Sequence, residues 1–377
     1  MLTIKKLSLL AAGAVCMVLS PAAQADTFSD TGAAVLVWPE VLVGPNTDTV
    51  LQITNQSNAP VAAHCFYVNA NSRCSNTGVP CTSSASCTQP GSPFVGACVP
   101  GWVEINFDIF LTANQPLGWS AENGLGGDEV PCQGGFFSPC TGNQGTRIPP
   151  VGETPFVGEL KCIQVDPITR LPQACGGGGL APCRNDLEGG ATITDVNLLT
   201  GIVNPARYNA VGLRTAGRND GDNLLIIGGD PEGAEYQPCS EVLVFNHLFD
   251  GAEDPISGEI TSTTVALVPC TQDFLAQQIP SVTAQFLVYN EFEQRFSTSR
   301  LVSCVLNSRI SLIDTTQPSR SIWSASVAGT VAGHTRITGV GGGLIGSADL
   351  DIGTGSHAGY NLNQFADREE ADFIRIP

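Results

Sequence analysis

Alternation of apolar and polar residues is the feature that most restricts the fold of this chain. In residues 102–112 every odd position from 103 to 111 is apolar, and only Phe110 breaks the polar series between them. A period of two residues predicts a β-strand with one buried and one solvent-facing side. Residues 48–70 show strand-like runs on both sides of a turn-forming stretch at 55–60. We expect residues 48–70 and 101–121 to pair as an antiparallel unit of a β-sandwich.

The remaining pattern is also that of strands. Strand-like runs begin at Phe156 and at Gly189, and two more flank an Asp-Gly hairpin-turn signal within residues 216–222. The only helical candidate is residues 270–280, about two turns ended by Pro280. With 42 Gly, 25 Pro and few charges, the chain is predicted to be an all-β protein with many turns.

A weak internal repeat suggests how the chain is divided. Residues 284–305 repeat the order of residues 51–66, namely strand, Asn-led turn, and strand with a cysteine near its end, and a tryptophan follows each segment, Trp323 and Trp119. This predicts one large or two related antiparallel β-sandwich domains of immunoglobulin type. The expected division is 1–25 signal peptide, 26–200 first sandwich with an insert at 73–99, and 201–377 second sandwich.

The N-terminal segment predicts export. Residues 1–25 combine Lys5 and Lys6, an apolar stretch from 7 to 19, and Ala23-Gln24-Ala25 before the cleavage point, as in a secretory signal peptide. Cleavage leaves 15 basic and 35 acidic residues, a net charge of −20, with Lys161 as the only lysine. This charge disfavours nucleic acid and anionic membranes as partners. The expected location is secreted, extracellular or at the cell surface, and the periplasm also fits.

Thirteen cysteines follow the predicted cleavage point, and in an exported chain they predict disulfides. Four of them lie in the polar insert, which cannot bury a core of its own: Cys74, Cys81, Cys87 and Cys98. A zinc site is the competing reading, but the insert has no Cys-x-x-Cys pair. Further bonds are expected among Cys132, Cys140, Cys175, Cys183, Cys239 and Cys270, and the last two could link neighbouring strands. Cys65 and Cys304 are expected to be buried and unpaired, or to pair with each other.

Several of these segments resemble a known group of proteins. The runs DTVLQITNQSNAPVAAHCFYVNA, FDIFLTANQPLGWSA, GELKCIQVD, YNAVGL and FEQRFSTSRLVSC look like those of loosely defined exported bacterial proteins built from immunoglobulin-like β-sandwiches. The segment CSNTGVPCTSSASC is similar to the short Cys-rich inserts of such proteins. The resemblance covers most of the mature chain and implies a fold, but no activity and no catalytic residue.

Motifs for catalysis are lacking in the sequence. The nearest approach to a nucleophile elbow, residues 355–359, has Thr354 where the first glycine is required. The four histidines form no His-x-x-x-His pair, so a zinc hydrolase is not indicated. We therefore predict a protein without enzymatic activity, and a hydrolase remains an alternative.

Acidic loops offer the only sequence-based site. Calcium requires six to eight oxygen ligands, which turns rich in Asp and Asn can supply. The candidate ligands are Asp220, Asp222, Asn223, Asp230 and Glu232, and a further acidic loop contains Asp250, Glu253 and Asp254. The competing reading is that these residues only form turns. The predicted role is structural or adhesive, with cell-surface or extracellular proteins or glycans as partners; the alternative is a calcium-dependent carbohydrate- or protein-binding module.

Overall fold

The computed structural model describes residues 31–88, 96–126, 147–172, 184–196, 201, 203–216, 222–229, 233–353 and 356–377. The predicted signal peptide, residues 1–25, lies outside these ranges. The described chain is all-β, as predicted, with 57% of residues in strands and 5% in helices.

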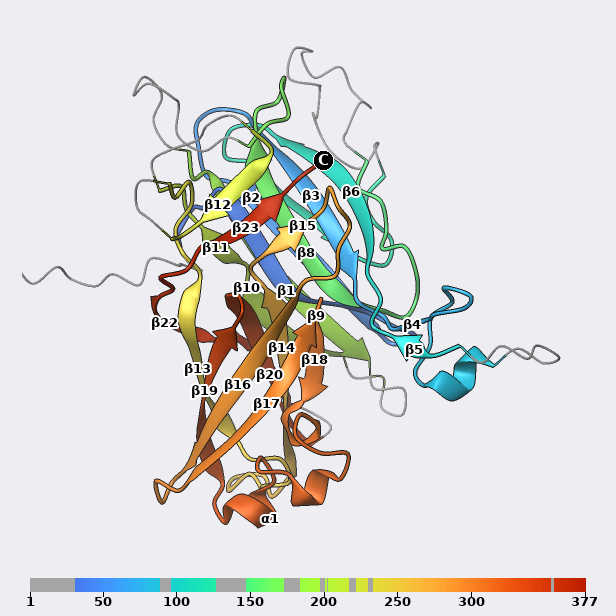
Figure 1. Ribbon diagram of the computed structural model, residues 1–377, viewed down its shortest axis with the longest axis vertical. Coiled ribbons are helices and arrows are strands. Elements are labelled where there is room, and N and C mark those ends of the chain that lie inside the picture. Colours follow the sequence, from blue (N-terminus) through green and yellow to red (C-terminus); the bar gives the residue numbers. More distant parts are fainter. Residues whose placement is uncertain are drawn as a thin grey trace, which may run out of the picture.

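Five sheets and one short ribbon contain all the described strands (Figure 1). Sheet 1 has the order β11 (Val211–Leu213), β1 (Val35–Val43), β8 (Phe156–Val165), β3 (Val61–Asn69), β6 (Val103–Leu111). Sheet 2 has the order β10 (Val203–Asn209), β9 (Leu187–Val196), β2 (Thr47–Asn55), β7 (Pro116–Ser120). Sheet 3 has the order β12 (Leu224–Ile227), β23 (Asp372–Arg375), β15 (Gln272–Asp273).

The later strands make the other two large sheets. Sheet 4 has the order β17 (Arg295–Ser303), β16 (Ser281–Asn290), β19 (Ala332–Val340), β13 (Ser240–Leu248), β22 (Asn363–Asp367). Sheet 5 has the order β18 (Leu306–Arg309), β14 (Thr261–Pro269), β20 (Leu344–Ile352), β21 (Ser356–Asn361). The ribbon joins β4 (Arg73–Cys74) to β5 (Cys98–Val99), and the helical elements are α1 (Ala325–Ala328) and 3-10 turns at Ser84–Cys87, Ile310–Leu312 and Pro318–Arg320.

The prediction of immunoglobulin-like β-sandwich domains is wrong. The sheets are small and are arranged as a five-bladed β-propeller. In the immunoglobulin order the first two strands are neighbours in one sheet, whereas here β1 pairs with β8 and β11, and β2 pairs with β7 and β9 in a different sheet. Alternation shows that a segment is a strand and which side it buries, but it does not show which strand lies beside it.

Both halves of the chain use the same strand order. Sheets 1 and 2 together contain nine strands of the first half, namely β1, β2, β3, β6, β7, β8, β9, β10 and β11, and sheets 4 and 5 together contain nine of the second, namely β13, β14, β16, β17, β18, β19, β20, β21 and β22. When the nine strands of each half are numbered along the chain, sheet 1 has the order 9-1-6-3-4, and sheet 4 has the same order when it is read from β22. Sheet 2 has the order 8-7-2-5, and sheet 5 has the same order when it is read from β21. The strand order thus matches β3 with β16 and β2 with β14. The repeat expected from sequence matched β2 and β3 with β16 and β17, which is one strand out of register.

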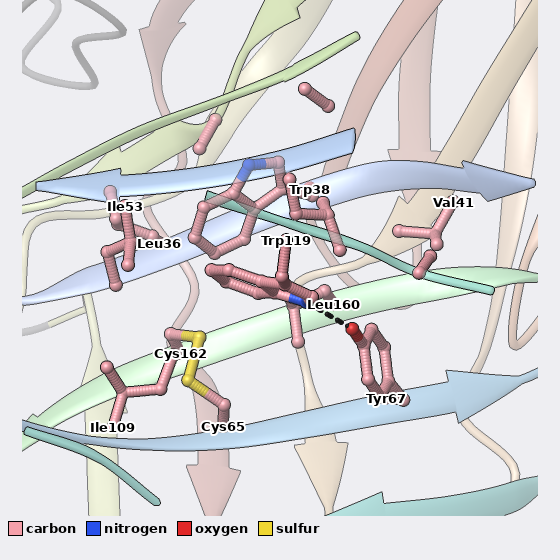
Figure 2. Close-up of a cluster of buried hydrophobic side chains, with 14 of the residues drawn as sticks. Leu36, Trp38, Val41, Ile53, Cys65, Tyr67, Ile109, Trp119, Leu160 and Cys162 are labelled. Atoms are coloured by element: carbon pink, nitrogen blue, oxygen red, sulfur yellow. Dashed lines mark hydrogen bonds between the residues drawn. A yellow bond between two sulfur atoms is a disulfide. The ribbon is translucent and has the colours of Figure 1, made fainter. Parts of the chain in front are cut away.

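Three apolar cores hold the sheets together. Core 1 lies between sheets 1 and 2, and core 3 lies between sheets 4 and 5. Core 2 lies between the other side of sheet 1 and sheet 3, with the ends of β14 and β20. Figure 2 shows core 1, where Trp119 Nε1 donates a 2.6 Å hydrogen bond to the Tyr67 hydroxyl beside the Cys65–Cys162 disulfide. Burying both rings with their polar atoms paired avoids the cost of an unsatisfied donor.

Individual strand predictions can now be compared with the structure. β2, β3 and β6 are strands, and β3 pairs with β6 in antiparallel register. The predicted helix at 270–280 is wrong: Gln272 and Asp273 form β15, and the Asp273 carboxylate accepts the Ala276 N–H in a turn. The hairpin predicted around the Asp-Gly at residues 220–221 is also wrong, because the flanking strands β11 and β12 pair with β1 and β23. The domain division at residue 200 stays a prediction; β9 and β10 pair across it.

A buried ion pair joins sheet 1 to β14. The side chains of Glu159 and Lys161 have no exposed surface, and the Lys161 ammonium lies 2.7 Å from both carboxylate oxygens of Glu159. The same ammonium donates a 3.3 Å hydrogen bond to the Pro269 carbonyl. The single lysine beyond the predicted signal peptide is therefore part of the interior.

Candidate functional site

The predicted calcium ligands are only partly within the described ranges. Asp220, Asp230 and Glu232 lie outside them. Asp222 Oδ1 accepts the Leu224 N–H at 2.7 Å, and the Asn223 carbonyl accepts the Ile376 N–H at 3.0 Å. The first of these contacts is a turn, as the competing reading expects, and calcium binding by this loop stays a prediction.

The third acidic loop has structural contacts. The buried Asp250 carboxylate lies 2.9 Å from Arg309 Nε and accepts the backbone N–H groups of Thr263 and Ser311. The Asp254 carboxylate accepts the Ser257 N–H and hydroxyl, and this bonding lowers the pKa of Asp254. Both carboxylates are therefore engaged in holding the loop.

Disulfides are present, as predicted. Within the insert Cys74 bonds to Cys87 and Cys81 to Cys98. Sulfur atoms of Cys74, Cys81 and Cys87 lie within 4.8 Å of one another, but zinc requires thiolates, and all three belong to disulfides. Cys239 and Cys270 are linked, and the bond joins the residue that precedes β13 to the residue that follows β14. The remaining four predicted cysteines lie outside the described residues: Cys132, Cys140, Cys175 and Cys183.

Cys65 is not the free or Cys304-linked residue that was expected. It faces Cys162 directly across β3 and β8, with a Cα–Cα distance of 4.1 Å, and the two are bonded. Cys304 is free and fully buried. Cys65 and Cys162 are 97 residues apart in sequence, so no local pattern predicts that they bond to each other. The register of β3 and β8 brings the two cysteines together.

The histidines are the side chains most suited to act as catalytic bases near neutral pH. His64 Nδ1 lies 2.8 Å from Asp108, which also pairs with Arg170. Burial alone would raise the pKa of Asp108, but its contacts with His64 and Arg170 lower it. His357 Nε2 lies 3.8 Å from Asp349 and 3.5 Å from Asp351. Across the described ranges no histidine has a serine or cysteine side chain as a hydrogen-bond partner. The described residues therefore contain no serine or cysteine that a histidine activates as a nucleophile.

Glu40 and Asp349 form a buried acidic junction between the two halves of the chain. Glu40, on β1, accepts hydrogen bonds from the Asn307 amide at 2.6 Å and the Ser347 hydroxyl at 3.3 Å. Burial and then the adjacent Asp349 raise the pKa of Glu40. Burial alone would lower the pKa of His357, but Asp349 and Asp351 together raise it. The junction thus favours a protonated Glu40, and it lies inside the molecule rather than in a cleft.

A groove of about 410 Å³ on the described surface is lined by aromatic, imidazole and amide side chains. It lies at the end of sheet 4 that leads into the β16–β17 turn. Residues from β13, β16, β19, β20 and β21 line it together with Glu291 in the turn after β16, and they include Asn246, Leu248, Tyr289, His334 and Tyr360. We call this feature the aromatic groove.

Strand register places the central side chains of the groove. His334 on β19 lies opposite Asn246 on β13 and opposite Tyr289 on β16, so all three side chains are on the same side of sheet 4. His334 Nδ1 lies 2.8 Å from the Asn246 amide oxygen, and the His334 and Tyr289 ring centroids are 6.3 Å apart. The Tyr360 hydroxyl reaches from β21 and donates to the Asn246 carbonyl at 3.1 Å. Contacts from three strands and a second sheet fix these rings in place.

Electrostatics in the aromatic groove favour neutral imidazoles. Burial and then Arg336 lower the pKa of His334. With Nδ1 donating to Asn246, neutral His334 offers the lone pair of Nε2 as an acceptor. His247, the buried neighbour of Asn246, has its pKa lowered to about 4, mainly by burial, and its Nε2 lies 2.9 Å from the Thr335 hydroxyl. Glu291 is the only acidic residue among the described residues of the lining.

Sequence reasoning did not find the aromatic groove. Neither Tyr289 nor Asn246 belongs to a sequence motif. The only sequence signal for it is the presence of polar and aromatic residues at outward positions of three strands. These residues can be recognised as one site only when the register of β13, β16 and β19 is known.

No helix within the described ranges is both long and apolar enough to cross a membrane. A scan against protein-family models and a search of curated proteins both found no match to this chain.

Proposed function

We propose that this chain is an exported adhesive protein, and that it holds a neutral carbohydrate in the aromatic groove. The single observation that carries the proposal is the set of cross-strand neighbours Asn246, His334 and Tyr289, closed on one side by Tyr360. The disulfides support export, because such bonds persist in oxidising compartments.

The ring faces supply the apolar part of recognition. A sugar ring has C–H groups on its faces, which fit against the negative face of an aromatic ring, and its hydroxyls need polar partners at the edges. Tyr289, His334 and Tyr360 supply the rings. A pocket that is mostly apolar, with a few placed polar groups, is the usual form of a small-molecule site.

The polar groups match hydroxyls rather than an anion. The Asn246 amide has N–H donors, neutral His334 has an acceptor, and Glu291 at the rim has a carboxylate. The chain has a net charge of −18, so a negatively charged sugar would be repelled. These groups therefore favour a neutral carbohydrate.

Binding fits the described lining better than hydrolysis does. Glycoside cleavage uses two carboxyl groups on opposite sides of the scissile bond, and the lining contains one, Glu291. This supports an adhesive role and disfavours the hydrolase alternative.

The test is a binding screen with neutral and acidic oligosaccharides, followed by calorimetry with the best ligand. Tyr289→Ala should weaken binding about tenfold, since an aromatic contact contributes up to about 1.5 kcal/mol. Phe292→Ala is the matched control, because Phe292 is 71% exposed on the adjoining turn and lies outside the groove lining. Failure of every neutral oligosaccharide to bind, or equal losses in both variants, would overturn the proposal.

A further inference from the structure

We infer that copies of this chain associate head to tail, with the β17 edge of sheet 4 in one copy docking beside the β22 edge of sheet 4 in the next. These strands are the two outer members of the same five-stranded sheet (Figure 1). In the described structure β17 pairs only with β16, and β22 pairs only with β13. The outer side of each edge strand therefore has backbone N–H and C=O groups that are not bonded to another strand of the sheet. A strand from another chain can add to the sheet by pairing with these groups.

The β17 edge is basic. β17 contains Arg295 and Arg300 and no carboxylate, although acidic residues outnumber basic ones by 35 to 17 in the chain. Both arginines are exposed, and neither makes an ion pair with any described residue. Leu301 on the same strand is 58% exposed.

The β22 edge is acidic. A hollow of about 570 Å³ lies beside it, and its lining includes Glu241, Asp367, Glu369 and Glu370 against one basic residue, Arg368. Glu369 is exposed and makes no described ion pair. Phe365 on β22 is 58% exposed. An exposed apolar residue and a charge of the opposite sign to β17 thus lie together at this edge.

The charges on the two edge strands determine whether each edge repels or attracts the edge of another copy. Charged residues on an edge strand normally prevent association, because two like edges repel each other. Here the two edges of one sheet have opposite charge, so β17 against β17 is unfavourable and β17 against β22 is favourable. The occupant of each edge is therefore a second copy of this chain. Since the two surfaces differ, the contact is heterologous and can continue into a chain or ring of copies.

Sedimentation velocity over a wide range of protein concentration, at low and high salt, tests the inference. The parent protein should form oligomers larger than dimers at low salt, and high salt should shift it toward monomer, because exposed charges are screened. Arg295→Glu/Arg300→Glu should be monomeric under both conditions, and so should Glu241→Arg/Glu369→Arg. Arg320→Glu changes an exposed arginine outside sheet 4 and should associate like the parent.

Mixing the two monomeric variants gives the decisive measurement. Each variant keeps the one edge that the other has lost, so the mixture should form a 1:1 complex although neither variant associates alone. A parent that stays monomeric at low salt, a parent whose largest species is a closed dimer, or a mixture that stays monomeric would each overturn the inference. Circular dichroism of each variant checks that it is folded.

Discussion

Removing the Cys65–Cys162 disulfide should be the most destabilising loss of any described crosslink. The variant is Cys65→Ala/Cys162→Ala, and the comparison is Cys239→Ala/Cys270→Ala. All four side chains are buried, so each pair of substitutions removes the same atoms from comparable surroundings. The two bonds differ in sequence separation, which is 97 residues for the first and 31 for the second.

The size of the effect follows from the unfolded chain. A crosslink removes loop-closure entropy, and the chain-entropy relation gives about 4.7 kcal/mol for the longer loop and about 3.7 kcal/mol for the shorter one at 25 °C. We therefore expect the core 1 variant to lose about 1 kcal/mol more free energy of unfolding than the comparison variant. Either loss is a large part of the roughly 5–15 kcal/mol that stabilises a typical protein.

Urea unfolding under non-reducing conditions measures both losses. Tryptophan fluorescence reports on core 1, because Trp38 and Trp119 are buried beside the disulfide (Figure 2). If the Cys239→Ala/Cys270→Ala variant were the less stable of the two, the loop-length reasoning would be refuted. A core 1 variant as stable as the parent would refute it as well.

Two further predictions concern pH. Burial and Asp349 raise the pKa of Glu40, so the stability that protonated Glu40 contributes is complete below the unfolded-chain pKa of about 4.3 and is lost as pH rises through the folded-state pKa. The Glu40→Gln variant should therefore become more stable relative to the parent toward pH 8. Urea unfolding measures this difference, and parallel pH profiles for the two proteins would contradict the prediction. The pKa of His247 is lowered from 6.5 to about 4, so the parent should lose about 3 kcal/mol as pH falls through that window. His247→Gln, which can still bond to Thr335, should lack that loss, and an unchanged acid limb of the stability profile would count against the assignment.

The sequence predicted strands well where one side of the strand faces a core. In β6 the alternating residues Phe107, Ile109 and Leu111 are buried as expected. Phe110, which interrupts the pattern, packs against core 2 and lies under the Arg170 guanidinium. The interruption thus had a physical cause, because both sides of sheet 1 are covered.

Pairing between distant strands could not be predicted from the same signal. Cys65 and Cys162 meet through the register of β3 and β8, and Glu40 meets Ser347 from the other half of the chain. The false helix at 270–280 has a related explanation: Phe274 is buried and stacks on Phe66 with ring centroids 3.9 Å apart. Tertiary contact outweighed a weak helical propensity in this segment.

Similar reasoning applies to the aromatic groove. Tyr289, His334 and Asn246 are far apart in sequence and each is ordinary for an exposed strand position. Their chemistry arises from being cross-strand neighbours, and no local pattern records that. The acidic loops could be recognised from sequence because their residues are adjacent in the chain. The described Asp222 and Asp254 carboxylates form turn contacts.

The position of β23 has a consequence for how the protein is made. Sheet 1 is assembled from strands that end by Leu213, but one side of it, with Val35, Val37 and Ile163, is covered in core 2 together with Ile374 of β23. During synthesis β23 is the last described strand to emerge, so the part of this apolar surface that Ile374 covers stays open to water until residues 372–375 have been made. A chain that stopped before Asp372 would leave that part uncovered. Chaperones and proteases that bind exposed apolar surface could then distinguish a chain that lacks β23 from one that contains it.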